Sequence, residues 1–456
     1  MHSTTDPANL HAVFKAYDVR GTVPEQLDED FARAVGNAFV QETGAAGASI
    51  VVGHDMRPSS PGFARAYAEG AADAGADVVL IGLASTDQLY FASGHLGMPG
   101  AMFTASHNPA QYNGIKQCRA HAVPLGMESG LAEIRDRVAD DGYVVADTRG
   151  VVTERDVLAD YAAYLLDLVP VEGRRLKVVV DAGNGMAGHT APAVLDGVVD
   201  VVPLYFELDG TFPNHEANPI EPENLRDLQA RVLAEGADIG LAFDGDADRC
   251  FVVDEQGRAI SPSVLTALIA ARELEKHPGS TIIHNLITSR AVPEIVREHG
   301  GTPVRTRVGH SFIKATMAET DAVFGGEHSG HFYFREFWRA DSGMLAALHT
   351  LAALAETEQP LSELLEASTR YVASGEINST VADQQVVLKA LEQEYGGRPG
   401  VELDHLDGLT VVATDWWFNV RASNTEPLLR LNAEGEDEST MTEIRDAVLD
   451  LIRSDR

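Results

Sequence analysis

Short apolar runs, each ending in glycine or in polar residues, recur along the first three-quarters of the chain. Residues 49–53, 76–82 and 176–181 are rich in valine, isoleucine and leucine, and residues 63–72 place small and apolar residues at helical spacing. Alternating strands and helices of this kind are typical of parallel α/β units. The pattern therefore predicts related α/β units whose strands end in loops of small and polar residues.

The pattern changes after residue 361. Residues 387–395 have helical spacing, residues 409–419 and 428–432 are rich in β-type residues, and residues 438–452 form an amphipathic helical pattern. This part of the chain predicts a smaller α+β domain. We therefore expect four domains, three of them related α/β units. Their predicted boundaries are 1–152, 153–255, 256–370 and 371–456.

Composition narrows the classes of partner. The chain has 456 residues, 45% of them hydrophobic, and a formal net charge of −34. Such a charge disfavours binding to nucleic acids and to anionic membranes. The chain contains no long uncharged apolar run, so we expect no transmembrane helix. The first ten residues lack the charged and apolar regions of a signal peptide. The two cysteines, Cys118 and Cys250, form no metal-binding pattern, so a cytoplasmic location is expected.

Three aspartates, Asp244, Asp246 and Asp248, alternate with small residues directly after the apolar run 237–243. In an extended backbone this spacing points all three carboxylates to one side, where they repel one another unless a cation lies between them. Oxygen ligands of this kind suit Mg²⁺. An EF-hand calcium loop is the rival interpretation, but Arg249 stands where that loop needs glycine, and both flanks have strand patterns instead of helical ones.

A polar loop with the sequence TASHNP occupies residues 104–109, between the apolar residues 101–103 and Lys116. Taken alone, these are ordinary residues of a turn or a helix cap. Ser106 becomes a candidate for chemistry only when the other loops of the chain are considered beside it.

Two later loops contain groups that suit a sugar phosphate. Glu327 and Ser329 lie among glycines, and a glutamate can accept hydrogen bonds from two adjacent sugar hydroxyls. Close to the C-terminus, a guanidinium fork and hydroxyl and amide donors form a compact phosphate cradle. An ordinary turn explains either loop equally well when that loop is taken alone. The residues of the cradle are Arg421, Ser423, Asn424 and Thr425.

A rival motif lies at residues 183–188, where GNGMAG matches G-x-G-x-x-G after an apolar run, with Glu207 about twenty residues further on. This is the fingerprint of a dinucleotide site. The same glycines also allow a helix to pack closely against its strand, which any doubly wound unit needs. The motif alone does not decide between these interpretations.

The four candidate loops occur in a fixed order along the chain. Their sequences are TASHNP at 104–109, DGDADR at 244–249, GEHSGH at 326–331 and RASNTEP at 421–427. In these motifs, and over nearly its whole length, the chain resembles the α-D-phosphohexomutase superfamily, most closely the phosphomannomutase/phosphoglucomutase group. The resemblance implies three related mixed α/β domains and a smaller C-terminal α+β domain around a central active-site cleft, with one loop from each domain.

The resemblance also implies roles for single residues. Ser106 would carry the phosphoryl group as phosphoserine, and a phosphoserine oxygen and the three aspartates would bind one Mg²⁺ per chain. Glu327 and Ser329 would hold the sugar hydroxyls, and the phosphate cradle would hold the phosphate that does not react. Further catalytic or binding candidates are Arg20, His107, Lys116, Arg249 and His310.

The reaction implied by the resemblance moves phosphate between C6 and C1 of a hexose through a 1,6-bisphosphate, which also serves as activator. Metal and cations would spread the charge of the transferring group. Lys116 or His310 would move the proton of the sugar hydroxyl, and the choice between them stays open. Because the bisphosphate must turn around without leaving, we expect a mobile fourth domain.

We therefore expect a phosphomannomutase, with glucose phosphates as second candidate substrates. Phosphoglucosamine mutase is the nearest rival, and the wider rivals are a nucleotide-dependent oxidoreductase and a non-catalytic sugar-phosphate binding protein. Two departures leave the sugar open: some members of the family have lysine within the segment that is 285–288 here, and several have methionine or glutamine where this chain has His328. We expect a monomer or a homodimer.

Overall fold

The computed structural model describes residues 4–422 and 428–454, with only the backbone at residues 310 and 311. The chain divides into two compact units. The first unit comprises Met1–Ser261 and Ser329–Ser362, and the second comprises Pro262–His328 and Glu363–Arg456.

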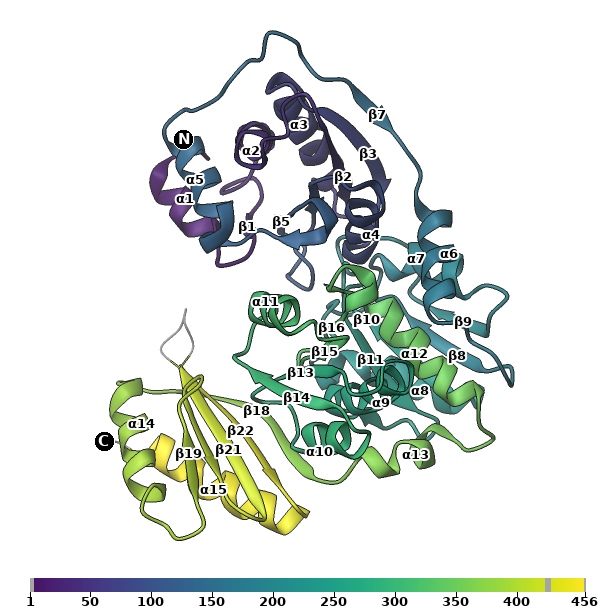
Figure 1. Cartoon of the computed structure of the whole chain (residues 1–456), viewed down its shortest axis with the longest axis vertical. Coiled ribbons are helices and arrows are strands. Elements are labelled where there is room, and N and C mark those ends of the chain that lie inside the picture. The colour runs from purple at the N-terminus through teal and green to yellow at the C-terminus, as the bar shows by residue number, and fades with distance from the viewer. Residues whose placement is uncertain (1–3, 423–427, 455–456) are drawn as a thin grey trace. The chain divides into compact units, whose positions relative to one another are not determined.

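The first sheet of unit 1 has mixed strand directions. Its strands are β1 (Val19–Thr22), β2 (Ser49–His54), β3 (Asp77–Leu83), β4 (Gly100–Phe103), β5 (Tyr112–Arg119), β6 (Val123–Pro124) and β7 (Val152–Glu154). Their order is β1-β5-β4-β2-β3-β7, with β6 paired to β5. Figure 1 labels β1, β2, β3, β5 and β7 of this sheet. β2 runs parallel to β3 and β4, whereas β5 runs antiparallel to β1 and β4.

The helices of this domain begin and end at residues that suit helix termini. α2 starts after Asp28, whose carboxylate accepts the N–H of Phe31, and stops at Gly44, which has φ of 67°. α4 starts after Ser85, whose hydroxyl accepts the N–H of Gln88. The helices are α1 (Pro7–Val13), α2 (Glu29–Thr43), α3 (Ser60–Asp73), α4 (Thr86–Leu96) and α5 (Ala132–Ala139).

The second sheet of unit 1 contains β8 (Lys177–Asp181), β9 (Asp200–Leu204), β10 (Ile239–Phe243), β11 (Cys250–Asp254) and β12 (Ala259–Ile260). Its order is β12-β11-β10-β8-β9. β8 is parallel to β9 and β10, whereas β10 and β11 are antiparallel. The helices of this domain are α6 (Leu158–Leu168), α7 (Ala187–Leu195) and α8 (Arg226–Glu235).

A later segment of the chain completes unit 1. It contributes the antiparallel pair β16 (Phe332–Phe334) and β17 (Ala340–Asp341) and the helix α12 (Gly343–Ala355). Every residue of α12 is buried, as expected for a helix that is apolar on all sides. The short helix α13 (Leu361–Leu364) lies where the chain passes into the second unit.

Unit 2 begins with a parallel α/β arrangement. β13 (Thr281–Asn285) pairs in parallel with β14 (Thr302–Thr306) and β15 (Phe324–Gly326). The helices are α9 (Pro262–Lys276), α10 (Ala291–Glu298) and α11 (His310–Thr320).

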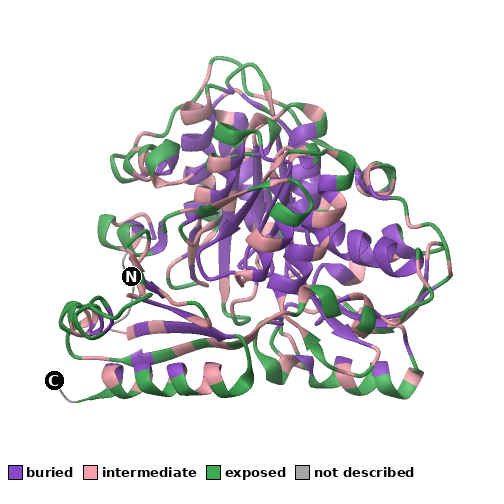
Figure 2. Ribbon diagram, turned by 60° about the horizontal axis from the view of Figure 1, so that its bottom comes forward, coloured by how far each residue is buried: buried purple, intermediate pink, exposed green. Residues whose placement is uncertain are grey.

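The C-terminal domain is an antiparallel sheet with two helices, α14 (Gln384–Tyr395) and α15 (Glu438–Arg453). Its strands are β18 (Val372–Thr380), β19 (Glu402–Asp404), β20 (Leu409–Val412), β21 (Trp416–Ala422) and β22 (Leu428–Gly435), in the order β18-β22-β21-β20-β19. The β-type stretch at 409–419 is thus two strands joined by a turn. Figure 2 shows that α15 alternates between buried and exposed residues, as its amphipathic pattern predicts.

These layers confirm the prediction of three α/β domains followed by a smaller α+β domain. Within the described residues, we find no helix that combines the length and apolar character needed to cross a membrane.

Candidate active site

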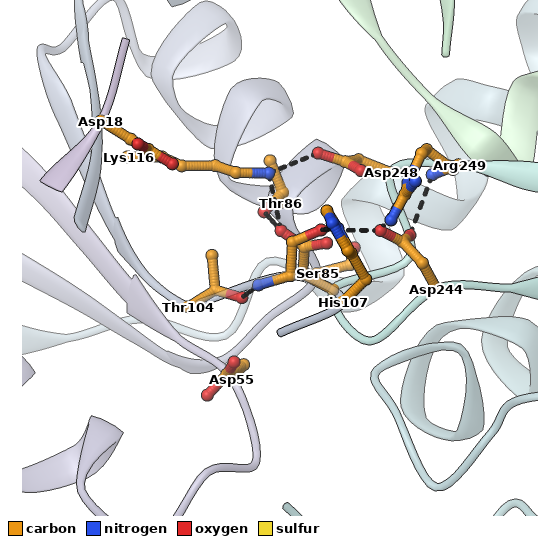
Figure 3. Close-up of polar contacts among 12 residues, drawn as sticks. Asp18, Asp55, Ser85, Thr86, Thr104, His107, Lys116, Asp244, Asp248 and Arg249 are labelled. Carbon is orange, nitrogen blue, oxygen red and sulfur yellow. Dashed lines mark hydrogen bonds and ion pairs between the residues drawn. The ribbon is translucent and has the colours of Figure 1, made fainter. Parts of the chain in front are cut away.

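Ser106 lies in the serine loop, residues 104–111, which joins β4 to β5. The hydroxyl oxygen of Thr104 accepts the N–H of Ser106 at 2.9 Å, and Ser106 has φ of 50°, in the left-handed region that residues other than glycine rarely adopt. Ser106 Oγ donates a hydrogen bond to Asp244 Oδ2 at 2.8 Å and lies 3.2 Å from Nδ1 of His107 (Figure 3). This strained turn therefore points the hydroxyl at a carboxylate from another sheet.

The aspartate loop, residues 244–249, is a turn between β10 and β11. The prediction of an extended backbone was wrong, because these neighbouring strands are antiparallel, with Phe243 paired to Cys250, and the loop must reverse the chain. Ala247 accordingly adopts φ of 61°. The expected convergence is nevertheless present: one oxygen from each aspartate lies within 4.8 Å of the others, and all three residues are buried. The aspartates are Asp244, Asp246 and Asp248.

Two cations compensate the three carboxylates. Arg249 donates from Nε to Asp244 Oδ2 at 2.8 Å and from its backbone N–H to Oδ1 at 3.1 Å. Lys116, on β5, donates from Nζ to Oδ2 of Asp246 at 2.7 Å and of Asp248 at 2.5 Å (Figure 3). Lys116 thus joins β5 to the aspartate loop by charge-assisted hydrogen bonds, and Arg249 forms such bonds within that loop.

Burial makes this excess of negative charge costly. Burial and repulsion from Asp246 raise the pKa of Asp248 well above its ordinary value. Burial also acts to raise the pKa of Asp246, but the attraction of Lys116 outweighs it, and the pKa is lowered. The pKa of Lys116 is raised well above its ordinary value, because the attraction of the two carboxylates exceeds the effect of burial. A divalent cation would relieve the remaining repulsion.

The residues present fit such a cation. Oδ1 of Asp246 and Oδ1 of Asp248 are buried and accept no hydrogen bond from the described residues. A buried carboxylate oxygen without a donor is costly, and oxygen atoms are the ligands that Mg²⁺ prefers. These two oxygens, with the Asp244 carboxylate within 4.8 Å, could hold a metal ion.

Two predicted residues of unit 1 lie in polar surroundings. Arg20, on β1, donates to Asn108 Oδ1 of the serine loop and pairs with Asp18. Ser329 Oγ lies 3.0 Å from Nδ1 of His331.

Two predicted residues of unit 2, Glu327 and Arg421, have polar partners within that unit. Glu327 is buried, and its Oε1 accepts the N–H of Gly309 at 3.2 Å and the amide of Asn285 at 3.4 Å. Arg421 pairs with Glu376, whose other oxygen lies 3.1 Å from Arg430 Nη1. The side chain of His310 and the cradle residues Ser423, Asn424 and Thr425 lie outside the described residues.

Two further residues, not predicted from the sequence, contact the aspartate loop. Thr86, the first residue of α4, donates from Oγ1 to Asp246 Oδ2 at 2.6 Å and from its N–H to the Asp246 carbonyl at 3.0 Å. Nε2 of His331 lies 3.6 Å from Asp248 Oδ1 and 3.9 Å from Asp341 Oδ2. Thr86 has no distinct signal in the sequence, whereas His331 ends the GEHSGH motif.

The glycines at 183–188 are explained by packing. A Cβ at Gly185 would lie 2.7 Å from the carbonyl oxygen of Gly245 in the aspartate loop, and a Cβ at Gly188 would lie 2.3 Å from the carbonyl oxygen of Phe206. Both glycines are therefore required by close approach of the main chain. The dinucleotide interpretation is not needed to account for them.

In a comparison with known proteins, four consecutive segments of the chain match the four domains of one protein family. Residues 11–143, 159–257 and 261–371 match the α/β/α domains I, II and III of phosphoglucomutase/phosphomannomutase, and residues 376–451 match the C-terminal domain. These matches agree with the order of the sheets described above.

Full-length relatives agree with the domain matches. A protein of Xanthomonas campestris pv. campestris described as phosphohexose mutases is 41% identical over 437 residues, covering 95% of this chain and 97% of the relative. The phosphomannomutase of Escherichia coli K12 is 39% identical over 447 residues, covering 96% and 97%. The crystal structure of a phosphoglucomutase/phosphomannomutase family protein from Burkholderia thailandensis superposes with a TM-score of 0.89 at 34% identity, covering 100% of this chain and 99% of that one.

Proposed function

Because this chain belongs to the phosphoglucomutase/phosphomannomutase family, we propose that it interconverts hexose 6-phosphates and hexose 1-phosphates, with mannose phosphates as its main substrates. The observation that carries the proposal is the Ser106 hydroxyl, which lies 2.8 Å from Asp244 Oδ2 beside a buried carboxylate trio. We propose mannose phosphates over other hexose phosphates because the Escherichia coli relative is a phosphomannomutase.

In the proposed reaction, Ser106 carries a phosphoryl group as phosphoserine. The free hydroxyl of the bound hexose phosphate attacks that phosphorus, its proton passes to a base, and the P–O bond to Ser106 Oγ breaks. The resulting hexose 1,6-bisphosphate turns around, Ser106 Oγ takes the other phosphoryl group back, and the sugar oxygen that is released takes up a proton. The monophosphate released differs from the substrate only in the position of its phosphate.

The surroundings of Ser106 suit the charge that moves in these steps. Asp244, Asp246 and Asp248 would hold Mg²⁺, which supplies charge compensation for phosphoryl oxygens when bound. Arg249 lies 2.8 Å from the same Asp244 oxygen that accepts the Ser106 hydroxyl, so its guanidinium is close to where the phosphoryl group would be attached. Lys116 balances the charge of the aspartate loop from the opposite side.

The binding roles are proposed from the same resemblance. Glu327 would accept hydrogen bonds from sugar hydroxyls, with Ser329 as a second contact. Arg20 and Arg421 would contact phosphate, the latter with the three cradle residues 423–425. The domain boundaries near 152, 255 and 370, the mobile fourth domain, the bisphosphate as activator, a monomeric or homodimeric state and a cytoplasmic location also remain predictions.

A substrate panel tests the proposal. Purified enzyme is assayed with mannose, glucose and glucosamine 1-phosphates in the presence of Mg²⁺ and a trace of the matching bisphosphate. We expect turnover that is largest for mannose, smaller for glucose and smallest for glucosamine. If turnover is largest for glucosamine 1-phosphate, the proposed preference for mannose is wrong. If the protein binds all three sugar phosphates without turnover, it is a binding protein instead of a mutase.

A further inference from the structure

Arg57 lies between β2 and α3, and its guanidinium is fully buried, with a side-chain exposure of 0%. A buried charge is costly unless it is paired and its N–H groups are satisfied. Nε lies 3.2 Å from Asp55 Oδ2, and the terminal nitrogens donate to main-chain carbonyls. Nη1 donates at 2.9 Å to Pro109 and at 2.9 Å to Tyr112, and Nη2 donates at 2.9 Å to Ser106 and at 2.7 Å to Asn108.

These four acceptors share one location. Three of them lie in the serine loop, and the fourth is Tyr112, the first residue of the strand that follows it. One guanidinium therefore binds carbonyl oxygens from Ser106 itself to the start of the strand that follows the loop. A fork with two terminal nitrogens is required for this, because a single ammonium group cannot reach four carbonyls in the same directions.

The carbonyl of Ser106 is also where the two central loops touch. A Cβ at Gly245, in the aspartate loop, would lie 2.4 Å from the Ser106 carbonyl oxygen, so that loop packs directly against it. The Arg57 Nη2 donates to the same oxygen. Because Ser106 is held at φ of 50°, a strained backbone conformation for a residue other than glycine, the conformation needs such surrounding contacts.

Arg57 is fixed on its other side by a loop of the second domain. Its guanidinium carbon lies 5.1 Å from the ring centroid of Phe212, a cation–π distance. A Cβ at Gly210 would lie 2.6 Å from the Cα of Arg57, so the two segments are in close contact. Asp55, which lies near Thr104 in Figure 3, pairs with the Nε side of the Arg57 guanidinium. The guanidinium thus has little freedom to leave the serine loop.

We propose that Arg57 is a positioning residue for phosphoryl transfer, which holds the main chain of the serine loop so that Ser106 Oγ stays directed at the aspartate loop. The inference rests on the proposed function, because it takes Ser106 as the phosphate carrier. Arg57 itself touches no reacting atom. Its effect is on the rate at which Ser106 gains and loses phosphate, since a displacement of about 1 Å can slow a positioned reaction by about a hundredfold.

The test compares Arg57→Lys with Arg119→Lys in the full-length protein. Arg119 is a suitable control because it also donates to main-chain carbonyls, those of Glu42 and Ser129, but lies at the end of β5 remote from Ser106. Single-turnover phosphorylation of Ser106 by hexose 1,6-bisphosphate is followed by quenching and intact mass. Binding of hexose phosphate and the melting temperature are measured on the same samples.

We expect Arg57→Lys to slow phosphorylation of Ser106 by about a hundredfold, with hexose phosphate binding changed less than threefold, whereas Arg119→Lys leaves the phosphorylation rate unchanged. A phosphorylation rate within threefold of wild type in folded Arg57→Lys overturns the inference and leaves the proposed function standing. Absence of phosphate on Ser106 in the wild type defeats the proposed function itself.

A second variant decides the case in which Arg57→Lys does not fold. Phe212→Leu removes the ring beside the guanidinium and leaves all four carbonyl contacts available. We expect it to slow Ser106 phosphorylation by about threefold or more without weakening hexose phosphate binding, because the guanidinium loses its cation–π contact and is held less firmly against the serine loop. An unchanged phosphorylation rate in Phe212→Leu overturns the inference.

Discussion

The region around Ser106 and the region around Arg421 hold their polar side chains in different ways. Ser106 is 5% exposed and Asp244 and Asp246 are 0% exposed, and each of them has at least one hydrogen-bond partner from a distant part of the chain. Arg421, on β21 and 13% exposed, instead pairs with Glu376 on β18, whose side chain is 26% exposed and which also pairs with the 33% exposed Arg430. The first region is a buried network, and the second is a partly exposed strand surface.

The difference indicates two tasks. A group that transfers phosphate must hold its charges in place in surroundings of low polarity, where small displacements change the rate strongly. A group that only binds phosphate can lie at a more exposed surface, where removal of one contact weakens binding and changes the chemical step less. Variants in the buried network should therefore reduce kcat, and variants at the strand surface should raise KM.

The largest effect is expected for Ser106→Ala. Removal of the hydroxyl removes the proposed phosphate carrier, so mutase activity should fall by at least about ten-thousandfold. Activity is measured with hexose 1-phosphate, Mg²⁺ and bisphosphate. Ser439→Ala, at an exposed serine of α15, should retain wild-type activity. Equal activity of both variants would remove Ser106 from the mechanism.

Asp246→Ala should have the next largest effect. The variant loses one of the two carboxylates whose Oδ1 accepts no hydrogen bond from any described residue, so Mg²⁺ should bind more weakly and kcat should fall by about a hundredfold or more. Titration with Mg²⁺ while activity is followed separates the two effects. Asp254→Asn is the matched control, because Asp254 is also 0% exposed but lies at the other end of β11. Loss of Mg²⁺ affinity in the control but not in Asp246→Ala would contradict the assignment.

Arg421→Lys tests the exposed side of the comparison. Lysine keeps the charge but loses the fork that suits a phosphate group, so KM for hexose phosphate should rise by about tenfold while kcat changes less. Arg398→Lys serves as control, since Arg398 pairs with Glu394 on the same domain. If kcat falls and KM does not change, the contrast between a transferring region and a binding region is wrong.

Asp87→Asn should give the smallest effect, and on stability instead of activity. Burial raises the pKa of Asp87 to about 6, against hydrogen bonds from Ser342, Ser85 and Tyr161 that lower it. Between about pH 4 and pH 6 the unfolded chain has released this proton while the folded protein retains it, so wild-type stability should fall with rising pH. Relative to the variant, the wild type should lose on the order of 3 kcal/mol of its free energy of unfolding, and this loss is complete above the pKa of Asp87 in the folded protein.

The measurement for Asp87→Asn is the midpoint of urea unfolding at several pH values between 4 and 7. The comparison with wild type isolates Asp87 from the carboxylates of the aspartate loop, which both proteins share. A difference between the two proteins that does not vary with pH would show that Asp87 does not retain its proton in the folded state.

Most of the fold was predictable because its signals are local. The apolar runs at 49–53 and 237–243 became β2 and β10, and the helical spacing at 63–72 became part of α3. The turn of the aspartate loop was not predictable from the spacing of its aspartates, because it depends on β11 being antiparallel to β10. Local spacing does not report which strands will pair.

The candidate site was predictable where its residues lie within one motif. Ser106 and the three aspartates follow apolar runs and fall in recognisable loops. Thr86 and Arg57 are single residues in unremarkable sequence, and their importance appears only when the chain folds and brings them to Asp246 and Ser106 from more than forty residues away. Contacts of this kind are set by tertiary packing, so a sequence pattern cannot reveal them.

The most direct test of the account is the location of the covalent phosphate. Enzyme incubated with hexose 1,6-bisphosphate and Mg²⁺ is quenched, digested and analysed by tandem mass spectrometry. The account predicts one added phosphate, on the serine of the TASHNP peptide at position 106, and none in Ser106→Ala. A phosphate on a different residue, or an active enzyme that never carries one, would contradict it.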